Sequence, residues 1–146
     1  MVVKYRAGVV PNAGPGPLDQ LALRLAADYA AAMDRLDLRA ALDTAWTLVS
    51  EADLYISRTA PWGLAKAGRQ PELDQVLASL VRALYRLAVL VSPFMPSKAA
   101  AIWDGLGQAG KPETAPWNGL QAPPAEGVTV TRVAILFPKP ESAPKT

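Results

Sequence analysis

The 146-residue sequence contains no cysteine and no histidine. Without cysteine the chain cannot form disulfides, thiolate zinc sites or thiol nucleophiles. Without histidine it lacks the usual general base and the commonest metal ligand. Gly105 and Gly107 end a predicted helix, whereas a phosphate-binding loop must precede one. The sequence therefore predicts no catalytic residue and no metal site, and it does not indicate an enzyme that acts alone.

Strong net charge and long apolar runs are also lacking. The chain has 15 lysines and arginines against 13 acidic residues, a formal charge of +2. This is too little charge for a protein that grips long duplexes through their phosphates, although it allows a small basic patch. Lys4 and Arg6 interrupt the first apolar residues, which excludes a secretory signal, and the apolar run 87–91 is far shorter than a membrane span. We expect a cytoplasmic protein with no membrane partner.

The apolar residues that are present follow helical spacing. With 51% hydrophobic residues, the chain can bury a substantial core, and we place a single domain at 1–138 and a flexible C-terminal tail at 139–146. Three stripes recur at three- and four-residue steps: Leu21, Leu25, Tyr29, Ala32 and Leu36; Leu38, Ala41, Leu42, Ala45, Val49, Ala52 and Ile56; and Leu73, Val76, Leu77, Leu80, Val81, Leu84, Leu87, Ala88 and Val91. Asp37 is a predicted N-cap between the first and second stripes. The two helices that carry these stripes should form a helical hairpin, and the helix that carries the third stripe should form the centre of a bundle.

The sequence also predicts where several residues beside these stripes lie. Trp46 is expected in the core. Arg82 and Arg86 lie near the end of the third stripe, where they would complement the negative end of the helix dipole. Asp19 falls off the apolar face of the first stripe. The other carboxylates of the first two helices are expected on solvated faces or as caps: Asp28, Asp34, Asp37, Asp43 and Glu51.

The C-terminal third changes in character. A short helix is predicted at 98–106, with Ser97 as its N-cap. A stretch rich in glycine, proline and alanine follows, with Trp117 as its only large anchor. The β-branched residues at 128–137 then predict an extended segment or a short strand.

The stretch 55–66 joins the second and third stripes and organises the chain. A proline after Ala60 disfavours helical backbone there, so the incoming helix should end at that residue. Trp62 then stands at the junction, with Arg58 and Lys66 on either side. A stiff indole in this place is either a packing anchor or a platform for an unstacked nucleotide base. Spacing alone favours the packing role and leaves the other open.

The sequence around this junction resembles the anticodon-binding domain of bacterial methionyl-tRNA synthetases. The resemblance rests on Ala-Asp-Leu-Tyr-Ile at 52–56 and Thr-Ala-Pro-Trp-Gly-Leu-Ala-Lys at 59–66. Three further segments agree in order and spacing, at 4–11, 90–96 and 136–141. The resemblance implies an all-α fold, namely the anticodon-binding helical bundle of class I synthetases with an extended C-terminal segment.

In this family the tryptophan of the Ala-Pro-Trp motif stacks on an anticodon base, and Trp62 is the matching residue. The resemblance implies an anticodon-binding region that comprises Trp62, Asp53, Arg58 and Lys66. Asp53 and Leu54 stand where the family usually has asparagine and arginine. The implied function is the anticodon-binding portion of a methionine–tRNA ligase, which recognises the CAU anticodon of methionine tRNA.

The resemblance also implies that the chain is N-terminally truncated relative to the family. The catalytic domain, which activates methionine with ATP and transfers it to tRNA, is absent from the sequence, and the family's first anticodon-domain helix would lie before Met1. The chain alone should be inactive and need no cofactor, while ATP and zinc belong to the full-length enzyme. The expected partners are methionine tRNA and a synthetase catalytic domain, in cis or in trans.

The missing helix leads to a structural expectation and leaves one alternative open. We expect an apolar groove on the bundle, lined by parts of the helices at 18–36 and 38–59, with a tendency to self-associate. The alternative is a non-catalytic helical protein-interaction module that kept this scaffold without tRNA binding. The absence of histidine and cysteine does not separate the two hypotheses, because both leave catalysis elsewhere.

Overall fold

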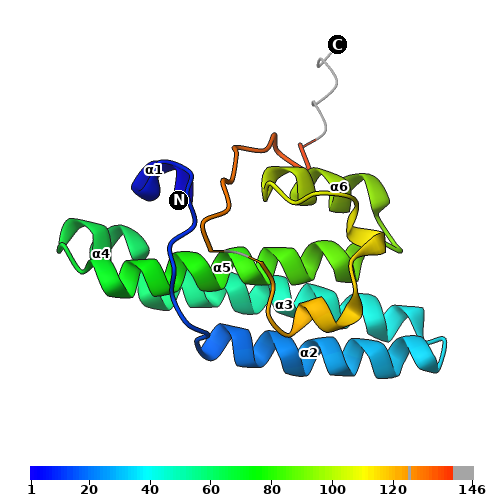
Figure 1. Cartoon of the computed structure of the whole chain (residues 1–146). Coiled ribbons are helices and arrows are strands. Elements are labelled where there is room, and N and C mark those ends of the chain that lie inside the picture. Colours follow the sequence, from blue (N-terminus) through cyan, green and yellow to red (C-terminus); the bar gives the residue numbers. More distant parts are fainter. Residues whose placement is uncertain (125, 140–146) are drawn as a thin grey trace, which may run out of the picture.

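Three long helices form the body of the protein. The computed structural model describes residues 1–124 and 126–139. In it α2 (Pro17–Asp34), α3 (Leu38–Thr59) and α5 (Gln70–Val91) lie side by side, and the chain reverses direction between α2 and α3 (Figure 1). The short helices α1 (Val2–Arg6) and α4 (Pro61–Lys66) lie near one end of α5, while α6 (Pro96–Gly105) packs against α5 nearer its other end. Two 3₁₀ turns follow, at Pro112–Thr114 and Trp117–Leu120. The all-α expectation is confirmed.

Proline and aspartate set the helix boundaries where the sequence predicts them. Pro17 is the first residue of α2, a position where its missing N–H costs nothing. Asp37 caps α3 by accepting a hydrogen bond from the backbone N–H of Ala40 at 3.0 Å. The predicted hairpin of α2 and α3 is confirmed, because these two helices pack extensively against each other. Ser97 is not a cap, since Pro96 already begins α6 and Met95 occupies the N-cap position.

The core lies between the inner faces of the three long helices. As predicted, α5 is the most deeply buried of them. Three expectations about the other helices are wrong. Leu38 is 54% exposed because it is the first residue of α3, and the buried face of that helix begins at Ala41. Leu36 is 83% exposed because α2 has already ended and Leu36 lies in the turn with a positive φ of 58°. Trp46 is 41% exposed because Ala45 and Leu48 face inward on α3, which turns the position after Ala45 away from the core.

A buried ionic cluster holds the loops to the bundle. Asp19 is 1% exposed and accepts hydrogen bonds from Arg82 at 2.8 and 2.9 Å and from Arg86 at 2.8 Å. Arg82 also donates to the carbonyls of Ala13 and Gly14, and Arg86 donates to the carbonyl of Leu120. The cluster therefore joins the loop before α2 and the end of the second 3₁₀ turn to α5.

This cluster corrects two expectations about charged residues. Arg82 and Arg86 do not serve the helix dipole at the surface, because they lie four residues apart on the inner face of α5, opposite Asp19. Asp19 does fall outside the predicted stripe, but it points inward from the first turn of α2. There its carboxylate also accepts the backbone N–H of Gly16 at 2.9 Å.

The cluster makes stability depend on pH. Burial by itself would raise the pKa of Asp19, but hydrogen bonds from Arg82, Arg86 and Gly16 outweigh it and lower the pKa from 3.8 to about 2. Because the folded-state pKa lies below the unfolded one, the carboxylate stabilises the fold above pH 3.8. We expect about 2 kcal/mol of this stability to be lost as the pH falls from about 4 to about 2.

Urea unfolding at successive pH values measures this loss. The exposed Asp28 on the same helix provides the control: Asp28→Asn should leave the acid-induced loss unchanged, because its carboxylate lies outside the cluster. A wild-type urea midpoint that stays constant down to pH about 2 would contradict the role assigned to Asp19.

The C-terminal segment at 128–137 is extended, which is one of the two predicted alternatives. Among the described residues it forms no strand, only a single antiparallel bridge between Val9 and Thr129. The N–H of Thr131 donates to the carbonyl of Gly105 at 2.8 Å, which ties the segment to the end of α6. At Gly107 a Cβ atom would lie 2.3 Å from the carbonyl oxygen of Thr129, so only glycine fits this crossing. The predicted tail at 139–146 lies, apart from residue 139, outside the described residues.

Candidate anticodon-binding surface

The backbone between α3 and α4 presents Trp62 to solvent. Ala60 takes a left-handed conformation, with φ 42° and ψ 64°, because the following proline disfavours the helical region. Its N–H closes α3 on the carbonyl of Ile56 at 2.9 Å, and its carbonyl accepts the N–H of Gly63 at 2.7 Å to open α4. Pro61 is buried, whereas Trp62 is 57% exposed. Two roles are open for Trp62, and the exposure of its indole favours a platform for a nucleotide base over a buried packing anchor.

Lys66 shares a face with Trp62. The two residues are the second and the last of α4 and lie four positions apart, which puts their side chains on one side of the helix. Lys66 is exposed, and its charge complements the carbonyl end of the short helix. An indole beside a lysine can stack on a base and attract the neighbouring phosphate.

Arg58 is the penultimate residue of α3 and lines a hollow. This hollow has a volume of about 510 Å³ and lies between α3, α4 and the start of α5; Tyr55, Arg69 and Glu72 line it with Arg58. Arg69 is engaged with Glu72 at 3.0 Å, and hydrogen bonds from the backbone N–H of Glu72 and from Arg69 lower the pKa of that carboxyl. Within the described ranges Arg58 and Lys66 make no ion pair, so both are available to an anionic ligand.

The structure does not bring all four predicted residues together. Asp53 is exposed on α3, but it borders an apolar hollow with Ile56 and Leu87 rather than the hollow beside Arg58. Five positions separate Asp53 from Arg58, a rotation that sends them to different sides of α3. The geometry therefore groups Trp62 with Lys66 on α4, places Arg58 in a hollow that neither of them lines, and leaves Asp53 apart.

Another basic residue near this end of the molecule is already paired. Arg6 of α1 donates to Asp74 of α5 at 2.5 Å and to Gln70 at 2.5 Å. This contact holds α1 beside the start of α5 (Figure 1). The pairing joins positions 68 residues apart, and no local pattern in the sequence signals it.

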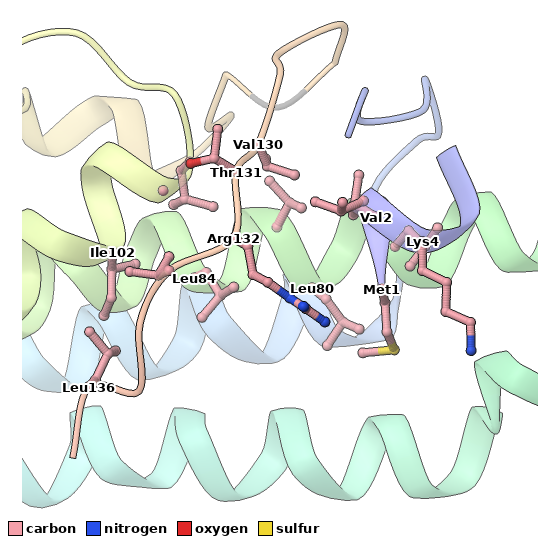
Figure 2. A pocket seen from close by; sticks show the side chains of 16 residues that line it. Met1, Val2, Lys4, Leu80, Leu84, Ile102, Val130, Thr131, Arg132 and Leu136 are labelled. Carbon is pink, nitrogen blue, oxygen red and sulfur yellow. The ribbon is translucent and has the colours of Figure 1, made fainter. Parts of the chain in front are cut away.

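An apolar groove runs along a different part of the bundle. Figure 2 shows its wider part, a hollow of about 620 Å³ beneath the C-terminal segment, with Arg132 reaching into it. A smaller hollow of about 170 Å³, between α3 and α5, shares Met1, Leu80 and Leu84 with it. The expected groove exists, and α3 lines its smaller part as predicted. The other predicted helix is wrong: α2 does not line the groove, because the inner face of α2 is covered by α3 and α5.

No helix in the described part of the chain is long and apolar enough to cross a membrane. The same residues contain no cluster of histidine, cysteine, aspartate or glutamate that could hold a metal ion.

Comparison with known proteins identifies the family of this chain. A family model for the anticodon binding domain of methionyl tRNA ligase matches residues 10–142. The methionine–tRNA ligase of Deinococcus radiodurans is 37% identical over an alignment of 150 positions, which covers 97% of this chain and 21% of that protein. That of Caldanaerobacter subterraneus is 35% identical, with 95% and 23% covered.

Solved structures agree with the sequence relatives. The apo form of Mycobacterium tuberculosis methionyl-tRNA synthetase superimposes with a TM-score of 0.84 at 26% identity, over 98% of this chain and 30% of that one. The chain thus spans about a fifth of the length of the curated relatives it matches. The match of the family model over most of the described bundle, together with the shared fold, shows that this chain belongs to the anticodon-binding domain family of methionyl-tRNA ligases.

Proposed function

We propose that this chain binds the anticodon loop of methionine tRNA through the surface around Trp62. The observation that carries the proposal is the 57% exposure of this indole at a backbone turn that Ala60 and the buried Pro61 keep rigid. Stacking of a base on an exposed aromatic side chain contributes about 1–3 kcal/mol. The family to which the chain belongs supports tRNA as the ligand.

Each of the four predicted residues receives a role in this proposal. Trp62 stacks on an unpaired base, while Lys66 and Arg58 attract the phosphates on either side of it. Stacking tolerates every base, so recognition of CAU also needs hydrogen bonds to base edges. Asp53 could accept one from the exocyclic amine of cytosine or adenine only if the loop reaches across α3. Of the four residues, Asp53 should therefore contribute least to the free energy of anticodon binding.

The salt dependence of binding tests the roles of the two cations. For a single strand the slope of log K against log salt changes by roughly 0.7 for each phosphate that the protein ceases to neutralise. The double variant Arg58→Gln/Lys66→Gln should therefore reduce the slope for an anticodon stem–loop by roughly 1.4. The exposed Arg39 provides the control, because it lies at the opposite end of α3, about 30 Å along the helix axis. An unchanged slope in the double variant, or an equal reduction in Arg39→Gln, would exclude the assigned roles.

We further propose that the reaction of the whole ligase takes place outside this chain, in the cytoplasm, on a catalytic domain supplied in cis or in trans. The described residues hold no phosphate cradle that could serve ATP, and we propose no ATP or zinc site here. The groove around Met1, Leu80 and Leu84 is the surface we assign to the contact with that domain, since it combines about 620 Å³ of apolar hollow with exposed apolar side chains. A protein-interaction module without tRNA binding remains the alternative, and the salt-dependence experiment separates the two.

A further inference from the structure

A second exposed tryptophan lies at the other end of the bundle from Trp62. Trp117 is 48% exposed and stacks on the buried Tyr29, with ring centroids 6.1 Å apart and planes inclined by 23°. Phe94 packs edge-on against Tyr29, with ring centroids 6.5 Å apart. Tyr29 and Trp117 border a hollow of about 680 Å³ between the ends of α2 and α5 and the first 3₁₀ turn.

The charges around this hollow are negative. Asp34 and Glu113 line it, and both are exposed. The hollow also borders the C-terminal ends of α2 and α5, where the helix dipoles place partial negative charge. Neither helix carries a basic residue in its last turn, and Arg35, the exposed C-cap of α2, does not line the hollow. The one nearby ion pair, Lys111 with Glu113 at 3.9 Å, is solvent-exposed and weak.

The hydroxyl of the largely buried Tyr29 has no hydrogen-bond partner here. Tyr29 is 4% exposed, and among residues 1–124 and 126–139 its hydroxyl makes no hydrogen bond. No fully buried polar side-chain atom in that part of the chain is unsatisfied, so this hydroxyl must reach solvent, and the hollow is the surface that Tyr29 borders.

We propose that this hollow binds an arginine side chain presented by a protein partner. A guanidinium is planar and stacks on an indole face while it donates hydrogen bonds to carboxylates. Trp117 supplies the face, Asp34 and Glu113 supply the carboxylates, and the hydroxyl of Tyr29 is a further acceptor. Nucleic acid is disfavoured at this place, because two carboxylates and two helix C-termini repel phosphates.

Titration of the whole chain with a blocked Gly-Arg-Gly peptide tests the proposal. The readout is the indole N–H resonance of Trp117 in NMR spectra, assigned with Trp117→Phe. We expect this resonance to shift saturably, and we expect the citrulline peptide, which has the same shape without the charge, to produce no shift. The double variant Asp34→Asn/Glu113→Gln should bind the arginine peptide about tenfold more weakly. Both positions are exposed, so the fold should be unaffected.

A matched variant controls for net charge. Asp43→Asn/Glu51→Gln removes the same two charges from α3, away from the hollow, and should leave the affinity unchanged. Equal binding of the citrulline and arginine peptides would overturn the proposal, since it would indicate an apolar pocket only. The absence of any shift at Trp117, or a shift there with an RNA oligonucleotide and not with the arginine peptide, would overturn it as well.

Discussion

Replacing Asp19 with asparagine should lower the free energy of unfolding by about 3–5 kcal/mol. The substitution leaves Arg82 and Arg86 buried, at 7% and 1% exposure, without the carboxylate that both now contact. It also weakens the cap that the carboxylate provides to Gly16. For a chain of this length such a loss corresponds to a fall in Tm on the order of 10 °C.

Thermal and urea unfolding measure this effect against Asp28→Asn. That control removes the same charge from an exposed position on the same helix and should change stability by less than about 0.5 kcal/mol. If the two variants proved equally stable, the cluster would not hold the loops to the bundle as described.

Replacing Trp62 with alanine should weaken anticodon stem–loop binding by about 1–3 kcal/mol and leave stability nearly unchanged. The side chain is 57% exposed and follows a turn whose shape depends on Ala60 and Pro61, not on the indole. If Trp62 were buried, its replacement with alanine would instead lower the free energy of unfolding by about 3–5 kcal/mol. Binding titrations and thermal melts on the same samples separate the two effects.

Trp46→Ala is the matched control for this experiment. Trp46 is also exposed, at 41%, and lies on α3 well away from the α3–α4 junction. Its removal should leave RNA affinity unchanged. A large fall in Tm for Trp62→Ala with unchanged RNA affinity would indicate that Trp62 is a packing anchor and would contradict its role in binding.

Local signals in the sequence predict the helix boundaries well. Proline before Trp62 ends α3 and starts α4 because its ring restricts the preceding residue, and Asp37 caps α3 because its side chain reaches the backbone N–H three residues on. Each signal acts within a few residues, so it can be read without knowing the tertiary structure. The same holds for Trp62, whose place at a junction follows from its neighbours.

Features that join distant residues could not be predicted in this way. The contact of Asp19 with Arg86 spans 67 positions, and nothing near Asp19 distinguishes it from a solvated carboxylate. The four-residue step from Leu42 predicts Trp46 in the core, but the neighbours of α3 select a face one position away. The place of the groove depends likewise on which helices cover α2, which apolar spacing does not reveal.

The most direct test of the central proposal is an NMR titration of the chain with the anticodon stem–loop of methionine tRNA, followed at the indole N–H of each tryptophan. We expect the resonance of Trp62 to shift saturably and those of Trp46 and Trp117 to stay in place, because Trp62 shares a face of α4 with Lys66, which makes no ion pair within the described residues, at the junction assigned to the anticodon. Binding that leaves the Trp62 resonance unmoved, or no binding at all, would contradict the assignment of this surface to the anticodon.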